Sequence, residues 1–416
     1  MKQVTKTMVI QENIKETPYG YKRVGNISIP EDWELKKFGD FVRKVKRKNI
    51  DNLPLEPCSV SKQYGVIYQN EKFTKRIATI DTTNYYIVRK GEFVYDPMSA
   101  YYGAVGRQKY NEDVVVSPAY EVFDVEGINK DFFEQVFTSE RIKRLYSYLS
   151  YGGNEYWKRM KLSWGSFCDI KFPVPPLHEQ EYIAKILKKQ DEHIKLIIQE
   201  IEQREVQKKG LMRKLVTGEL RLPGFGRDWE QIRLGDVLKE RKETGYNELE
   251  LLSITAKRGV VRRKEIDIKD NSSDDKGKYK RILPNDIGYN TMRMWQGISG
   301  VSQLEGIVSP AYTVLIPTSK IDPYYMAYLF KYSETIYLFW RYSQGIVDDT
   351  LNLKYSNFKK IRVTIPSDIL EQKAIAKILS IQDKIIELLE KSLDLEKDRK
   401  HGLMQLLLTG KSRVKV

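Results

Sequence analysis

The sequence contains one long internal repeat. Residues 178–222 align without a gap on residues 370–414, and 19 of the 45 positions are identical. The segments before them also match, because "YDPMSAYYGAVG" at 95–106 corresponds to "YNTMRMWQGISG" at 289–300. The repeating unit is about 190 residues long, whereas solenoid repeats span roughly 20 to 50 residues. The chain therefore has two homologous halves, each a globular part followed by a long helix.

Each half ends in the pattern of a long amphipathic helix. The prolines of "KFPVPP" forbid a helix, and Glu179 and Gln180 open the apolar repeat that follows. The repeat has near-heptad spacing, and Gln190 and Gln382 interrupt it at the same place in both copies. Each helix has one apolar stripe to bury, most simply against the other helix in an antiparallel pair. We expect the seam to contain Ile183, Leu187, Ile194, Ile197 and Ile201 from the first helix and Ile375, Leu379, Ile386, Leu389 and Leu393 from the second.

The glycine after each helix has a structural interpretation. Gly218 and Gly410 lie just past the last apolar position, where a residue in the left-handed conformation closes a helix. The letters "GKS" at 410–412 also match the end of a phosphate-binding P-loop. However, Gln405 stands where that motif needs a glycine, and a leucine-rich helix precedes it where the motif needs a strand. We expect no nucleotide site there.

The parts before the helices have mixed secondary structure. "NYYIVRKGEFVY" alternates as a strand does, and "NKDFFEQVFTSERIKRLYSYL" has helical periodicity. The predicted fold class is α+β: two homologous mixed α/β domains separated by two long helices that pair as an antiparallel coiled coil. The expected boundaries are 1–173 for the N-terminal segment and first domain, 174–222 for the central helix, 223–364 for the second domain and 365–416 for the C-terminal helix.

Composition favours a polyanion as partner. The chain has 71 Lys and Arg against 56 Asp and Glu, a net charge of +15. Such a charge attracts nucleic acid through counterion release. A membrane surface is the weaker candidate, because the basic residues are spread along the chain instead of forming one basic amphipathic helix. No apolar run has the length of a membrane span, and the N-terminus lacks the apolar core of a signal peptide. We expect a cytoplasmic protein.

The sequence shows no catalytic or metal motif. No G-x-G-x-x-G follows a predicted strand, and the Asn-Pro-Pro-aromatic tetrad of an amino-methyltransferase is absent. Cys58 and Cys168 have no partner at zinc-ligand spacing. The histidines, His178, His193 and His401, are not repeated in the other half. We expect no catalytic residue, metal or cofactor in this chain.

Without a catalytic or metal motif, we expect the chain to act by binding. The two halves differ in the segments where binding residues would lie. "SVSKQYGVIY" stands against "SITAKRGVVR", and "YGGNEYWKRM" against "SQGIVDDTLN". Cations that can hold phosphates occur there with side chains that can address base edges. The candidate DNA-binding residues are Lys62, Tyr64, Arg107, Trp157, Lys158 and Arg159 in the first half, and Lys257, Arg258, Arg262, Arg293, Trp295 and Gln296 in the second.

These motifs together resemble a known family. "IPEDWELKKFGD", "YDPMSAYYGAVG", "VSPAY", "FPVPPLHEQEYIAKIL" and the repeat "LEQKAIAKIL" cover nearly the whole chain. They are similar to the specificity subunits of Type I restriction-modification systems. The resemblance implies two target-recognition domains, each reading half of a split, asymmetric sequence in double-stranded DNA, and two helices that set the spacing. It also implies methyltransferase subunits with S-adenosylmethionine and restriction subunits that use ATP and magnesium, all on partner chains.

Two alternatives stay open at this point. One is a self-sufficient restriction or modification enzyme with an active site that the sequence does not reveal. The other is a noncatalytic coiled-coil scaffold whose basicity only keeps it soluble. Methylation and cleavage assays on the pure chain separate the first alternative from a recognition subunit, and salt-dependent binding to duplex DNA counts against the second.

Overall fold

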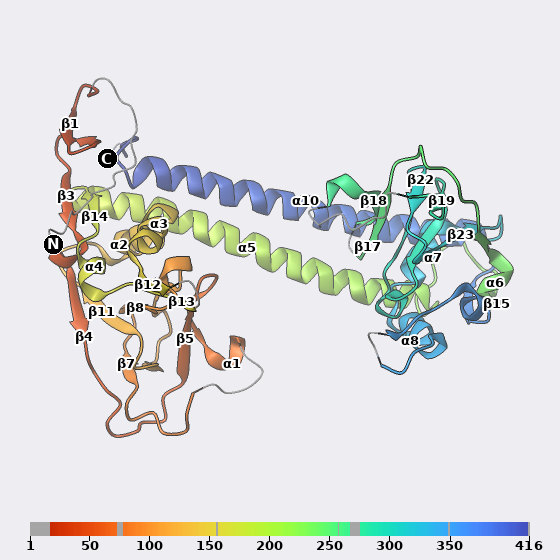
Figure 1. Cartoon of the computed structure of the whole chain (residues 1–416), viewed down its shortest axis with the longest axis horizontal. Coiled ribbons are helices and arrows are strands. Elements are labelled where there is room, and N and C mark those ends of the chain that lie inside the picture. Colours follow the sequence, from red (N-terminus) through yellow and green to blue (C-terminus); the bar gives the residue numbers. More distant parts are fainter. Residues whose placement is uncertain are drawn as a thin grey trace. The chain divides into compact units, whose positions relative to one another are not determined.

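The computed structural model describes residues 17–72, 78–154, 157–256, 258–266, 275–347 and 350–414, with the backbone alone for 72, 151–154 and 157–159. The chain divides into two compact units (Figure 1). Unit 1 comprises Met1–Leu196 with Leu393–Val416, and unit 2 comprises Ile197–Ser392. Each unit therefore contains part of each long helix.

The long helices are α5, Leu177–Val216, and α10, Ile369–Leu407. Helix α5 carries Glu179 in its first turn and Arg213 and Lys214 in its last turn, which is the charge order that the helix dipole favours. Gly218 and Gly410 have φ angles of 75° and 73°. The prediction that these glycines close the helices in the left-handed conformation is confirmed.

Helices α5 and α10 pack together within each unit. In unit 1, Ile183 and Leu187 near the start of α5 share a core with Leu407 at the end of α10. In unit 2, Leu215 near the end of α5 shares a core with Ile375 near the start of α10. The pairing is therefore antiparallel, as the apolar stripes predicted.

None of the predicted seam residues is exposed. Ile183, Leu187, Ile197, Ile375 and Leu379 are buried, and Ile194, Ile201, Ile386, Leu389 and Leu393 are half-buried. The polar Gln190 is also buried, and its amide donates to the backbone oxygen and Oε2 of Glu396 at 3.2 and 2.5 Å. A satisfied polar group in an apolar seam fixes the register of the pair.

Within the described residues of unit 1, the strands form two four-stranded sheets and three two-stranded ones. The first large sheet has the order β6-β5-β10-β7: Gly65–Tyr68, Pro57–Ser61, Val114–Val116 and Tyr86–Val88. The second has the order β4-β11-β8-β9: Val42–Val45, Glu121–Val125, Phe93–Tyr95 and Val105–Arg107. The pairs are β1-β2, Tyr21–Val24 and Ile27–Pro30; β3-β14, Glu34–Lys37 and Lys171–Val174; and β12-β13, Tyr151–Asn154 and Trp157–Lys161.

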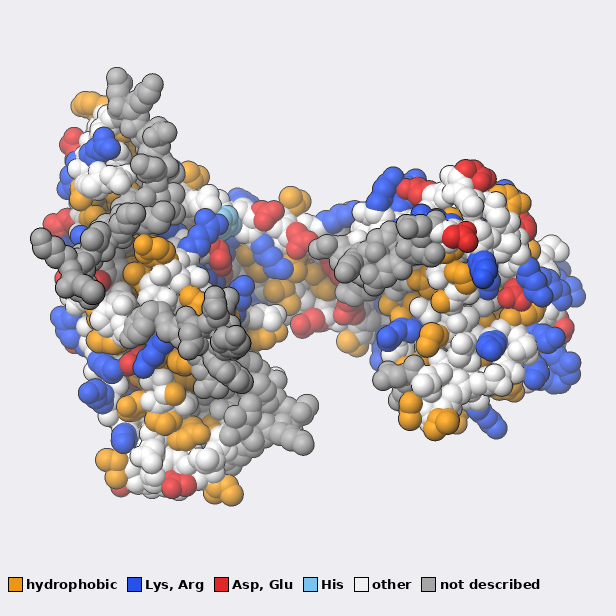
Figure 2. Space-filling model, in the orientation of Figure 1, with side chains coloured by type: hydrophobic (Ala, Val, Ile, Leu, Met, Phe, Trp, Pro, Cys, Tyr) orange, Lys and Arg blue, Asp and Glu red, His pale blue; other side chains and the backbone are white. Residues whose placement is uncertain are grey.

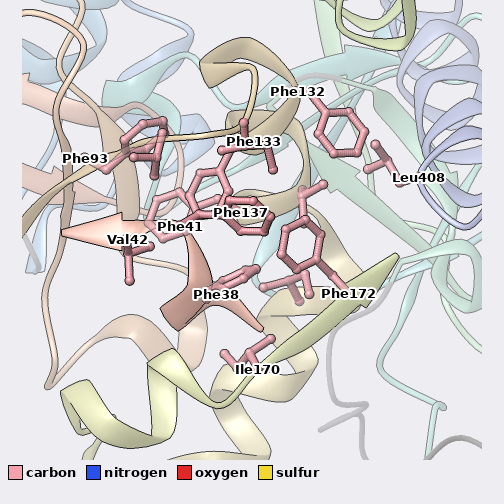
Figure 3. Close-up of a cluster of buried hydrophobic side chains, with 14 of the residues drawn as sticks. Phe38, Phe41, Val42, Phe93, Phe132, Phe133, Phe137, Ile170, Phe172 and Leu408 are labelled. Carbon is pink, nitrogen blue, oxygen red and sulfur yellow. The ribbon is translucent and has the colours of Figure 1, made fainter. Parts of the chain in front are cut away.

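Short helices cover these sheets and close an aromatic core. They are η1 Phe38–Asp40, α1 Gln69–Lys72, η2 Ala100–Tyr102, α2 Lys130–Phe137, α3 Glu140–Leu149 and α4 Trp164–Cys168. The ring of Phe38 packs against three other rings of this core, with its centroid 5.1 Å from those of Phe133, Phe167 and Phe172. Figure 3 shows Phe38 among Phe133, Phe137 and Phe172. Each such pair adds about 0.5–1.5 kcal/mol beyond the burial of its area. Leu408, just after α10, joins the same core.

Unit 2 repeats this plan. Its four-stranded sheet has the order β16-β23-β20-β21: Leu238–Arg241, Tyr312–Pro317, Ile287–Asn290 and Ser299–Val301. The pairs are β15-β24, Trp229–Arg233 and Arg362–Pro366; β17-β18, Leu252–Thr255 and Gly259–Arg262; and β19-β22, Lys280–Ile282 and Gly306–Val308. The helices are α6 Leu234–Val237, η3 Arg263–Glu265, η4 Met294–Gln296, α7 Pro323–Leu329, α8 Ser333–Tyr342 and α9 Tyr355–Phe358. The predicted fold class, mixed α/β domains with paired long helices, is confirmed.

A buried glutamine joins the globular part of each unit to a long helix. Gln180 accepts a hydrogen bond from the backbone N–H of Asn129, the N-cap residue of α2, at 2.9 Å. Gln372 accepts one from the backbone N–H of Asp322, the N-cap residue of α7, at 2.8 Å. Each glutamine also donates to the backbone oxygen of a proline before its helix at 2.9 Å. We call these contacts the glutamine joints.

An arginine clasps the first turn of each long helix. In unit 1, Arg413 binds Glu179 with Nε and Nη2 at 2.9 and 2.8 Å and Asp32 with Nη1 and Nη2 at 2.8 and 2.7 Å. In unit 2, Arg221 binds Glu371 with Nε and Nη2 at 2.8 and 3.1 Å. Both glutamate side chains are only 1% exposed. We call these the Arg413 clasp and the Arg221 clasp.

Across the described parts of the chain, no helix is both long enough and apolar enough to span a bilayer.

Candidate nucleic-acid interface

A β-hairpin of unit 1 presents two of the predicted residues at its turn. Strands β5 and β6 are joined by a turn in which Lys62 and Tyr64 are exposed, Tyr64 to 61%. The Ser61 hydroxyl accepts the backbone N–H of Tyr64 at 3.0 Å, and Gly65 has a φ of 64°. A left-handed glycine suits so tight a turn. The turn therefore holds a cation and an aromatic ring in solvent.

Two glycines set the position of this turn. A Cβ added to Gly106, on β9, would lie 2.7 Å from the Cα of Gly65, so Gly106 has no room for a side chain. The close approach places the turn near η2, and a Cβ on Gly103 would meet the Cγ of Lys62 at 3.5 Å. Tyr102 of η2 is 47% exposed. We call Lys62, Tyr64 and Tyr102 hairpin surface 1.

Unit 2 has the same glycine-to-glycine contact, with other side chains around it. Gly259, with a φ of 63°, begins β18, and its Cα lies 2.6 Å from a Cβ placed on Gly300 of β21. The turn before Gly259 carries Arg258, which corresponds to Tyr64 in the alignment of the halves. The helix η4, which precedes β21, includes Trp295 and Gln296 and has Arg293 as its N-cap residue. We call Arg258, Arg293, Trp295 and Gln296 hairpin surface 2.

Hydrogen bonds orient the side chains around η4. The indole N–H of Trp295 donates to the backbone oxygen of Met292 at 3.0 Å, and Nη1 of Arg293 donates to Oε1 of Gln296 at 3.4 Å. Arg293 and Gln296 are exposed. An arginine can bind guanine with two hydrogen bonds and a glutamine can bind adenine in the same way. Hairpin surface 2 therefore has the groups needed to address base edges.

Carboxylates already pair with the cations of the β17-β18 hairpin. Arg258 lies 3.2 Å from Glu265, and Arg262 lies 2.8 Å from Glu250 and 3.4 Å from Glu265. The hydrogen bond to Glu250 raises the pKa of Arg262 above its ordinary value. A phosphate that bound either arginine would compete with these glutamates, so the hairpin is less attractive to polyanions than its arginines alone suggest.

Arg107 has a different environment from the other predicted residues. Its side chain is 18% exposed, and Nη1 lies 2.5 Å from Asp131 and 3.4 Å from Glu134, both on α2. Its guanidinium also lies over the ring of Phe93, 5.6 Å from the centroid. These contacts give Arg107 a role in attaching α2 to the sheet and leave little free charge for a ligand.

Four predicted residues are not tested by these contacts. Trp157, Lys158 and Arg159 belong to β13, whose backbone pairs with β12, but their side chains lie outside the described part of the chain. Lys257 also lies outside the described residues. Their role in DNA binding stays a prediction.

Sequence reasoning missed the aromatic residues of η2. Tyr101 and Tyr102 have ring centroids 5.0 Å apart, and Tyr102 is exposed. The signal was present, because the repeat aligns Tyr101 with Trp295 and Tyr102 with Gln296. Comparing the two halves position by position would have added Tyr102 to the candidates.

The described residues contain no cluster of three or more His, Cys, Asp or Glu side chains that could hold a metal ion. Burial raises the pKa of the Cys58 thiol to about 12, which leaves it protonated and a poor nucleophile. His178, His193 and His401 are all exposed.

Fold and surfaces together define a class of protein: two homologous binding units, built on one scaffold with different contact residues and carried by paired helices. Residues 30–204 and 226–397 each match the profile of the Type I restriction modification DNA specificity domain. These segments cover most of the chain, which belongs to this family.

Individual relatives match over almost their whole length. The Type I restriction enzyme MjaVIII specificity subunit of Methanocaldococcus jannaschii is 26% identical over 446 residues, covering 98% of this chain and 99% of the relative. The putative type I restriction enzyme MjaX specificity subunit of the same organism is 23% identical, covering 97% and 98%. The solved S subunit of a Type-I restriction-modification system from M. genitalium aligns with a TM-score of 0.55 at 14% identity, covering 94% of this chain and 99% of that chain. This solved structure shares the fold of the chain.

Proposed function

We propose that this chain is the DNA-recognition subunit of a Type I restriction-modification complex and that each half reads one half of a bipartite, asymmetric target in double-stranded DNA. The observation that carries the proposal is the pair of hairpin surfaces. Both rest on a glycine-to-glycine contact, Gly65 with Gly106 and Gly259 with Gly300, and present different side chains. One scaffold with two sets of contact residues fits a target with two different halves.

The chemistry of the hairpin surfaces supports a division of labour. Lys62 can hold a backbone phosphate, and the rings of Tyr64 and Tyr102 can pack on sugars or bases. In unit 2, Arg293 and Gln296 are exposed and suited to base edges in the major groove. The candidates whose side chains are not described, with Lys158 and Arg159 among them, extend this set.

The chain is a recognition subunit without a catalytic centre of its own. Methyltransferase subunits that hold S-adenosylmethionine dock on the paired helices, and restriction subunits supply ATP- and magnesium-dependent cleavage. We assign 1–173 to the N-terminal segment and the first target-recognition domain, 223–364 to the second domain, and 174–222 and 365–416 to the helices that set the spacer. The complex acts on DNA in the cytoplasm.

Methylome sequencing of the host with and without the gene tests this function. One split, asymmetric motif should lose its methylation when the gene is deleted. Replacing residues 32–173 by the corresponding domain of a relative should then change one half of the motif and leave the other half intact. The purified chain alone should neither methylate nor cut DNA. Turnover by the pure chain, or a change in both halves, would refute the proposal.

A further inference from the structure

A basic hollow of about 380 Å³ lies on unit 2, at the pair of strands β15 and β24. Its lining residues are Arg233, Gly235, Asp236, Lys359, Lys360 and Arg362. The four cations are all exposed. Figure 2 shows Lys and Arg side chains gathered on the part of unit 2 where Figure 1 places β15 and α6. This surface shares no residue with hairpin surface 2.

The cations of the basic hollow repel one another. Arg233 and Arg362 are direct partners across the antiparallel pair of β15 and β24. Like charges in such positions destabilise a sheet. Among the described residues, no carboxylate forms an ion pair with Arg233, Lys359, Lys360 or Arg362. The hydrogen bonds that two of them make, Arg362 to Gln231 at 3.2 Å and Lys360 to Asn357 at 3.2 Å, go to neutral amides.

The charges balance in the equivalent place of unit 1, which has Lys37 and Lys171 with Asp169 and with Asp40, the counterpart of Asp236. Lys37 and Lys171 are partners across β3 and β14, as Arg233 and Arg362 are in unit 2. Here, however, Asp169 stands where unit 2 has Lys360, and it binds the ammonium of Lys37 at 2.8 Å. Cys168 stands where unit 2 has Lys359. The scaffold therefore does not require a basic hollow. In unit 2 a bound anion from outside the chain would neutralise the cations of the basic hollow.

We infer that the basic hollow of unit 2 binds phosphates of the DNA backbone outside the sequence that the unit reads. This inference rests on the proposed function. The lining offers charge alone: it contains no aromatic ring on which a base could stack, and its cations are open to solvent. Small ligands need enclosure and directed polar groups, whereas a polymer of phosphates gains affinity from charge through counterion release. For a DNA-recognition subunit, the available polyanion is the duplex that flanks the half-site read by unit 2.

The test measures how DNA affinity depends on salt, using the full chain assembled with its methyltransferase partner. The probe is a duplex with the methylated motif and flanks of about 20 base pairs, two helical turns, on both sides. Arg233→Gln with Arg362→Gln removes two cations. Lys37→Gln with Lys171→Gln is the matched control in unit 1. Lys360→Asp is a second variant, because it places in unit 2 the carboxylate that neutralises unit 1.

Loss of two phosphate contacts should make the plot of log affinity against log salt shallower by about 1.8. The ratio of the wild-type DNA affinity to that of the double variant should therefore fall about 12-fold between about 50 and about 200 mM salt. A duplex without the motif should show the same change, and Lys360→Asp should act in the same direction. A duplex truncated at the edge of the half-site of unit 2 should abolish the difference between wild type and variant. The control should keep the wild-type slope, and the methylated motif should not change.

An unchanged slope in both unit 2 variants would overturn the inference. So would loss of the methyltransferase partner at an unchanged slope, which would assign the basic hollow to an acidic protein surface. Neither result touches the proposed function, which fails instead if the wild-type complex selects no bipartite motif.

Discussion

Replacing Arg413 by alanine tests how much the Arg413 clasp stabilises the segment that follows α10. The guanidinium of Arg413 lies between the carboxylates of Asp32 and Glu179, and the side chain of Glu179 is 1% exposed. The guanidinium also lies over the ring of Trp33, 6.0 Å from the ring centroid. Without Arg413 the buried carboxylate of Glu179 keeps only the indole N–H of Trp33 as a described side-chain donor, at 2.9 Å. Removing one partner of a fully buried pair costs about 3–5 kcal/mol. Arg413 itself is 39% exposed, so we expect roughly 2–3 kcal/mol after solvent screening.

Hydrogen exchange read by mass spectrometry measures this loss where it occurs. The amide of Ser412 donates to the backbone oxygen of Leu406 at 3.2 Å and that of Leu408 to Met404 at 3.0 Å. A loss of 2–3 kcal/mol in local opening free energy corresponds to exchange about 30 to 150 times faster in these amides. An increase below about threefold, or less than ~0.7 kcal/mol, would refute the reasoning.

Two further variants test whether the cost comes from charge. Arg221→Ala breaks the equivalent clasp on Glu371. The amide of Leu220, which donates to the backbone oxygen of Lys214 at 2.9 Å, should then exchange faster as well. Adding Glu179→Gln to Arg413→Ala removes the uncompensated buried charge and should restore part of the protection. If the double variant opens as readily as the single one, the cost does not come from the charge of Glu179.

Three other predictions concern the candidate interface, the Arg413 clasp and the long helices. Arg293→Ala should weaken binding to the half-site of unit 2 by about 1–3 kcal/mol in competition assays, whereas Arg107→Ala should lower the melting temperature and leave the methylated motif unchanged. Burial acts to raise the pKa of Asp32, but the hydrogen bond from Arg413, a backbone hydrogen bond and the charges of Arg413 and His178 together hold the pKa below its ordinary value of 3.8. The ionised Asp32 therefore stabilises the folded state fully above its ordinary pKa of 3.8, and this stabilisation is lost as the pH falls through the lower pKa of the folded state. In acid titrations, the difference in free energy of unfolding between wild type and Arg413→Ala should narrow only below about pH 3.8. Seven residues inserted after Glu200, and seven after Ser392, lengthen each helix by about 10 Å and keep the apolar seam, so the gap in the methylated motif should widen by about one to three base pairs with the same bases read. An unchanged gap at unchanged affinity would show that the helices do not set the spacing.

The repeat allowed the helices and their pairing to be predicted, because a long heptad stripe leaves few ways to bury itself. The seam from Ile183 to Leu393 follows from spacing alone. The interface was harder to predict, since the sequence shows which side chains are cationic but not which acids meet them. Arg107 looks like a binding residue until α2 brings Asp131 and Glu134 against it.

The basic hollow shows the same limit from the other side. Its two arginines come from strands at opposite ends of unit 2 in the sequence. The pairing register of β15 and β24 places Arg233 opposite Arg362. No local pattern in the sequence predicts that register.

The glutamine joints bear on how new specificities can arise. Gln180 and Gln372 each hold the main-chain N–H of a helix-capping residue, and that residue is Asn129 in one half and Asp322 in the other. A peptide N–H is common to every residue except proline, so the helix side of the joint makes no demand on the incoming side chain. At this joint, a recombination event that exchanges the whole globular part needs only to deliver one peptide group to the right place. Lineages carrying such a gene can therefore acquire a foreign domain without a compensating change at Gln180 or Gln372.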